Sequence, residues 1–102
     1  MHENIICLLF GSQVKQPSTK SDFDLLFVIP EQFFNSSFER KVKNQLAPYN
    51  CDINIVTEKG LLDMWANPSR LNVGNEILKS HIVLYGAEHF YNLMIKHYKG
   101  EG

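Results

Sequence analysis

The stretch that decides the fold runs from residue 9 to residue 29. Residues 9–12 read Leu-Phe-Gly-Ser, a nine-residue spacer follows, and residues 22–29 read Asp-Phe-Asp-Leu-Leu-Phe-Val-Ile. Apolar residues run almost unbroken through 5–10 and 23–29, which predicts two strands covered on both faces of a sheet. Gly11 is expected to end the first strand and Pro30 the second.

Two aspartates, Asp22 and Asp24, open the second predicted strand. Side chains two residues apart on a strand share a face, with Cα atoms roughly 6.5 Å apart. Carboxylates this close repel each other, which costs stability unless a cation lies between them. Mg²⁺ suits this position, because proteins hold it with one or two carboxylates together with the phosphates of a substrate.

The whole pattern resembles the signature of a known superfamily. An apolar strand, Gly11-Ser12, a short spacer and Asp22-x-Asp24 at the start of a second apolar strand are typical of the DNA polymerase beta-like nucleotidyltransferases. The chain is most similar to their small members, the minimal nucleotidyltransferases of the type that pairs with HEPN proteins as an antitoxin. The clear resemblance covers residues 5–62.

That resemblance implies a site that binds two Mg²⁺ ions and transfers a nucleotidyl group, with AMP from ATP as the expected group. Two such ions lie about 3.5–4 Å apart and hold the attacking and leaving oxygens in line. Asp22 and Asp24 are then expected to bridge the ions as catalytic and metal-binding residues. Gly11 and Ser12 are expected to bind the triphosphate, through close backbone approach and hydrogen-bond donors.

The third acid of the site has two candidate positions. Asp52 carries a charge and lies in the third predicted strand, while Asn54 follows two residues later and shares its face. With Asp52 in the position, the resemblance implies a catalytic, metal-binding acid that also activates the acceptor hydroxyl. With Asn54 in the position, the chain is expected to bind a nucleotide without turning it over. We favour Asp52, because only it carries the charge.

The remaining sequence alternates strand and helix patterns. Ser36 and Glu39 form a predicted capping box, and an amphipathic helix is indicated by the four-residue recurrence of Phe34, Phe38, Val42 and Leu46. The expected strands are residues 5–10, 23–29, 52–56 and 81–85, and Gly86 is expected to break the last of them. The expected helices are 36 to before Pro48, a short helix capped by Thr57 that runs through Trp65, and 69–80 and 87–98. Interleaved strands and helices predict an α/β (α+β) fold, a small mixed β-sheet with helices packed on it, in one domain of residues 1–102. The resemblance implies the nucleotidyltransferase version of this layout.

The charge pattern argues against nucleic acid as a partner. The net charge is −1 and no run of Lys or Arg is present, whereas duplex binding needs clustered cations. The family often has a basic or aromatic residue after the serine, but this chain has Gln13; Lys15 or Lys20 could supply charge from the loop.

Location is expected to be cytoplasmic, without a membrane partner. No apolar run approaches the roughly 20 residues of a membrane span, and the first residues lack the pattern of a signal peptide. Cys7 and Cys51 are read as small buried hydrophobic residues in a reducing compartment.

Aromatic residues have two readings. Trp65 is expected to be a core residue, with a base-stacking platform as the alternative. The last helix carries a core face with Phe90, and its second stripe of Tyr91, Ile95 and Tyr98 makes a subunit interface plausible, either with a HEPN-type protein or in a homo-oligomer.

Three functions remain open at this point. The first is an enzyme that adenylylates a tyrosine of a small helical HEPN-type partner in a toxin–antitoxin pair, as the resemblance implies. The second is a catalytically silent binding module that neutralises a partner by contact. The third, transfer to a small molecule, needs a substrate-binding domain that this chain does not show.

Overall fold

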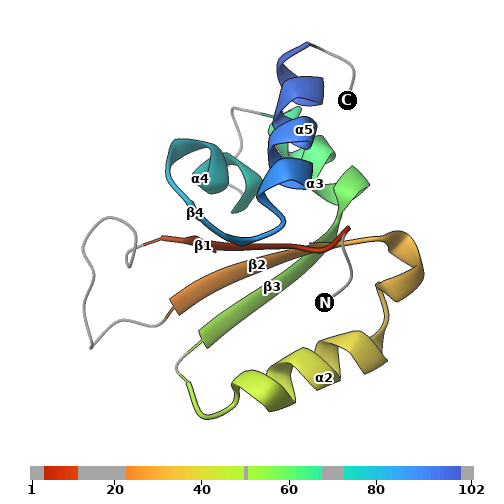
Figure 1. The fold of residues 1–102 in the computed structure, drawn as a ribbon, viewed down its shortest axis with the longest axis vertical. Coiled ribbons are helices and arrows are strands. Elements are labelled where there is room, and N and C mark those ends of the chain that lie inside the picture. The colour runs from red at the N-terminus through yellow and green to blue at the C-terminus, as the bar shows by residue number, and fades with distance from the viewer. Residues whose placement is uncertain (1–3, 12–22, 50, 68–72, 100–102) are drawn as a thin grey trace.

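The described chain forms one four-stranded sheet with helices on both faces (Figure 1). The computed structural model describes residues 4–11, 23–49, 51–67 and 73–99. The strands are β1 (Ile6–Phe10), β2 (Phe23–Ile29), β3 (Cys51–Thr57) and β4 (Ile82–Tyr85), and the helices are η1 (Glu31–Phe33), α2 (Ser36–Leu46), α3 (Glu58–Trp65), α4 (Val73–Lys79) and α5 (Ala87–Tyr98). The predicted mixed sheet with packed helices is confirmed. Among the helices in the described ranges, none is both long and apolar enough to cross a bilayer.

The two predicted buried strands form the centre of the sheet. Its order is β3-β2-β1-β4, with β1 antiparallel to both neighbours and β2 parallel to β3. Because side chains alternate along a strand, Leu8 and Leu26 point to one face and Cys7 and Phe27 to the other. Helices cover both sides, which is why both sets of side chains are apolar.

The two faces of the sheet have separate cores. We call the side covered by α3, α4 and α5 the helix-rich face and the side covered by α2 the α2 face (Figure 1). The helix-rich face is built on the strand residues Ile6, Leu8, Phe10, Leu26 and Val28. The α2 face is built on Ile5, Cys7, Leu25, Phe27 and Ile29.

Trp65 is a core residue of the helix-rich face. Only 1% of it is exposed, its Nε1 donates a hydrogen bond to the Gly74 carbonyl oxygen at 2.8 Å, and its ring meets that of Phe90 edge-on with centroids 6.0 Å apart. The core prediction for Trp65 is confirmed. The base-stacking alternative is wrong, because the ring is enclosed between α4 and α5.

The N-cap of helix α2 lies one residue before the predicted one. The N-cap is Asn35, whose side chain accepts a hydrogen bond from the Phe38 amide at 2.9 Å, and Ser36 is the first helical residue. The capping box of Ser36 and Glu39 is therefore wrong by one position. Phe34 lies outside the helix and is 54% exposed, so it does not belong to the buried stripe. The other three stripe residues pack on the α2 face: Phe38, Val42 and Leu46.

Helix α3 has the cap that the sequence predicts. Thr57 ends β3, and its hydroxyl oxygen accepts a hydrogen bond from the Gly60 amide at 3.1 Å. The chain therefore passes from strand to helix without an intervening loop. The start of the next predicted helix, at Ser69, lies outside the described residues.

The two cysteines form no disulfide within the described residues, and they differ in burial. Cys7 is buried in the α2 face, and burial, with a smaller contribution from Cys51, raises the pKa of its thiol to about 11. Cys51 is only half-buried. The reading as a buried hydrophobic residue therefore holds fully for Cys7 and partly for Cys51.

Gly86 joins β4 to α5 in a conformation that favours glycine. Its φ is +81°, and an added Cβ would lie 2.5 Å from the Ile5 carbonyl oxygen and 3.2 Å from the Ile6 Cα. A side chain here meets backbone that belongs to the sheet and cannot move cheaply. The predicted break at Gly86 therefore has a steric cause.

We predict that Gly86→Ala lowers the free energy of unfolding by more than about 2 kcal/mol. Alanine is strained at this positive φ, and its Cβ would also clash with the Ile5 carbonyl oxygen. Chemical denaturation measures this. Gly60→Ala is the matched control, because Gly60 has no positive φ and its Cβ would contact Thr57 Oγ1 at 3.3 Å. The prediction would be contradicted if Gly86→Ala lowered the unfolding free energy no more than Gly60→Ala does.

Candidate functional site

A row of side chains crosses the sheet where β1 ends and where β2 and β3 begin. In the strand register, Phe10 pairs with Asp24, and Asp24 pairs with Asp52. Residues paired in register on adjacent strands point to the same face, with Cα atoms roughly 4.8 Å apart. Asp24 is half-buried and Asp52 is exposed. Two carboxylates therefore lie side by side at the end of the helix-rich face, where the sheet meets solvent.

The turn after β1 lies directly against one of these acids. Gly11 has φ +80°, and a Cβ placed on it would lie 3.2 Å from Asp24 Cγ and closer still to Asp24 Oδ2. Any other residue would both strain the backbone and collide with the carboxylate. The positive φ therefore favours glycine here, and the Gly11 backbone lines the same corner of the site.

The register also separates the two candidates for the third acid. Asp52 pairs with Asp24, whereas Asn54 pairs with Leu26, which is completely buried in the core. Both Asp52 and Asn54 face the helix-rich side. Asn54 lies two residues further along β3, away from the solvent end, and is half-buried. The acid that adjoins Asp24 is Asp52.

Several predicted site residues lie outside the described residues, namely Ser12, Gln13, Lys15, Lys20 and Asp22. The structure therefore brings together Gly11, Asp24 and Asp52 from the predicted set. Within residues 4–11, 23–49, 51–67 and 73–99, no three His, Cys, Asp or Glu side chains gather into a group that could hold a metal ion. That search does not include Asp22.

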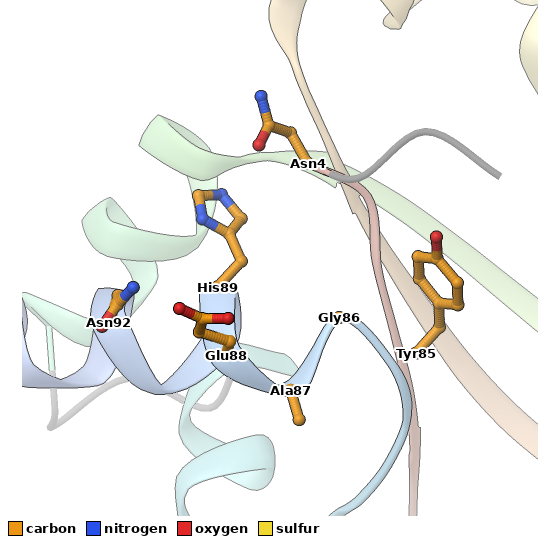
Figure 2. Close-up of a pocket in the computed structure, with 7 residues that line it drawn as sticks. All are labelled: Asn4, Tyr85, Gly86, Ala87, Glu88, His89 and Asn92. Carbon is orange, nitrogen blue, oxygen red and sulfur yellow. The ribbon is translucent and has the colours of Figure 1, made fainter.

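A second polar site lies at the other end of β1. A cavity of about 420 Å³ is lined by Asn4, Tyr85, Gly86, Ala87, Glu88, His89 and Asn92. Figure 2 shows that Glu88, His89 and Asn92 project from the start of α5, with His89 extending toward Asn4. Gly86 adjoins Ile5 and Ile6, whereas Gly11 follows Phe10, so the cavity and the acid pair lie at opposite ends of the strand.

One residue of the cavity lining, His89, makes a contact that the sequence did not predict. Nε2 of His89 contacts Oε1 of Glu58, the first residue of α3, and both side chains are partly exposed. The two residues are 31 positions apart, so no local pattern could have signalled the pair. It links the first turns of α3 and α5, and we assign it a structural role.

Comparison with known proteins does not extend this description. No family model matches the chain, and no significant match is found among curated proteins or solved structures.

We predict that the cost of Gly11→Ala depends on Asp24. In the native background the substitution combines backbone strain with the clash against the carboxylate, whereas in an Asp24→Ala background only the strain remains. The loss in unfolding free energy should therefore be smaller by about 1 kcal/mol or more in the Asp24→Ala background. Denaturation of the four chains of this double-mutant cycle measures the coupling, and strictly additive losses would refute the close approach.

Proposed function

We propose that this chain is a metal-dependent nucleotidyltransferase that moves AMP from ATP to a hydroxyl group of an acceptor protein. The observation that carries the proposal is the in-register pair of Asp24 and Asp52, with Gly11 packed against Asp24. Two adjacent carboxylates on one face are an electrostatic cost for a small protein. Such a cost is offset when the pair holds a cation, and the phosphates of a nucleotide can complete its ligands.

The available donors suit Mg²⁺. Carboxylate oxygens are ligands that Mg²⁺ prefers, and Asp24 and Asp52 present them at the solvent end of the sheet. When bound, Mg²⁺ would neutralise charge on the phosphate oxygens during transfer. Asp22 is proposed as a further ligand on the basis of the sequence pattern alone.

The residues of the site are proposed to act by position and charge. Gly11 lets the backbone approach the phosphates closely, because glycine has no side chain. A Cβ at this corner would also strike Asp24. Asp52 is the more exposed acid, so it can accept the proton of an incoming acceptor hydroxyl. The hydroxyl oxygen then bonds to the α-phosphorus of ATP, the bond between that phosphorus and the bridging oxygen breaks, and pyrophosphate leaves.

A protein acceptor fits the chain better than a nucleic acid or a small molecule. The net charge of −1 without a Lys or Arg run does not favour a duplex. We therefore propose a small helical HEPN-type partner in a toxin–antitoxin pair as the acceptor. The proposed setting is the cytoplasm, where ATP is abundant and a reduced thiol such as that of Cys7 persists.

The silent binding module remains the second candidate. It requires Asn54 to take the place of the third acid, and the pairing of Asn54 with buried Leu26 argues against that place. The register therefore supports the enzyme over the module.

The experiment that tests the proposal follows label from ATP to protein. The purified chain is incubated with Mg²⁺, ATP labelled on the α-phosphate and its co-purifying partner. We predict that Asp24→Asn and Asp52→Asn each reduce labelling at least about 100-fold, because each removes charge from the reacting centre. Asp63→Asn is the matched control, since Asp63 is an exposed acid on α3.

Other results of this experiment separate the candidates. Partner binding without label transfer, unchanged by either substitution, would support the silent module. Loss of labelling in Asn54→Ala but not in Asp52→Asn would place the third acid position at Asn54 and contradict our assignment. Competition by unlabelled nucleotides identifies the preferred base.

A measurement that needs no partner tests the acid pair itself. Without divalent cations, Asp52→Asn should raise the melting temperature, because it removes repulsion with Asp24. Added Mg²⁺ should raise the melting temperature of the native chain and have a smaller effect on Asp52→Asn. Equal responses of the two chains to Mg²⁺ would refute cation binding by the pair.

A further inference from the structure

The outer face of α5 exposes more apolar surface than a solvent-facing helix needs. Tyr91, Ile95 and Tyr98 are exposed by 49%, 50% and 69%. The opposite side of the same helix is fully engaged, with Phe90 and Leu93 buried in the core of the helix-rich face. The predicted second stripe of α5 is therefore a continuous surface feature, separate from the core stripe.

Opposite charges lie at the two ends of this stripe, with Glu88 at the start of α5 and Lys99 at its end. With 3.6 residues per turn, Glu88, Ile95 and Lys99 fall within roughly 40° of one another around the helix, and the two tyrosines lie on one flank. Glu88 and Lys99 are both exposed and lie about 16 Å apart along the axis. The outer face is thus acidic at its start, apolar in the middle and basic at its end.

We propose that this face binds a second copy of the chain, with the two α5 helices antiparallel about a two-fold axis. In that arrangement Glu88 of each copy lies opposite Lys99 of the other, and Ile95 and Tyr91 pack near the axis. A two-fold interface must be self-complementary, and an acid–apolar–base sequence along one helix meets that requirement only when the helices run in opposite directions.

The size of the face sets the strength of the contact. Helix α5 has 12 residues and is about 18 Å long, so the pairing falls at the low end of specific interfaces. We therefore expect a weak dimer that forms with increasing concentration and weakens with salt, because its exposed ion pairs are screened. The acid pair of the candidate site lies at the other end of the sheet from the start of α5, so this inference does not rest on the proposed function.

A charge-swap experiment tests the antiparallel arrangement. Glu88→Lys and Lys99→Glu are made as two separate chains, and dimerisation is measured by sedimentation equilibrium. Each variant alone places like charges opposite each other at both ends, and its dissociation constant should rise about tenfold. An equimolar mixture restores both opposite-charge contacts, and the mixed dimer should return to within about threefold of the native value.

Two further chains locate the interface. Ile95→Asp should weaken the dimer at least about tenfold, because it places a charge in the apolar centre. Lys59→Glu is a matched charge change at an exposed residue of α3 and should leave dimerisation unchanged. Circular dichroism checks that all variants are folded.

Three results would overturn the inference. One is a native chain that stays monomeric at all concentrations at low salt. Another is a dimer that tolerates Ile95→Asp, which would point to pairing of the edge strand β4. The third is a mixture of the two charge variants that is no tighter than either alone.

Discussion

The parallel pairing of β2 with β3 is the constraint on which the rest of the structure depends. Seven residue pairs run in register from Phe23 and Cys51 to Ile29 and Thr57. The side-chain period of a strand is two, so a slip of one residue would turn every side chain of β3 to the other face. Ile53 and Ile55 would then leave the α2 face and Asp52 would leave Asp24. The apolar core thus specifies the position of the acids.

The placement of the acids limits their cost to folding. Along the helix-rich face of β2, Asp24 is followed by Leu26 and Val28, both completely buried. A carboxylate pair in that interior would be deprived of water without compensation, whereas at the start of the strands it remains in contact with solvent. A buried apolar core and two adjacent acids can therefore coexist in one short sheet.

Local patterns predicted most elements, and tertiary geometry explains what they missed. Helix α5 has its expected bounds because Gly86, at positive φ, ends β4 and because the helix has a clear apolar period. The cap of α2 was misplaced because Asn35 and Ser36 are both good capping residues. Asp52 and Asn54 share a face, so strand periodicity could not separate them, and only the alignment of β3 against β2 does.

The exposed face of α5 has a cause in the size of the chain. A domain of about 100 residues buries a smaller fraction of its surface than a large one, so some apolar side chains must stay outside. Three of them, Tyr91, Ile95 and Tyr98, lie together on α5. This helix already gives one stripe to the core, so its other stripe has only solvent or a partner to face. Opposite charges at its two ends favour one orientation over non-specific association. The acid pair lies at the far end of β1 from the start of this helix.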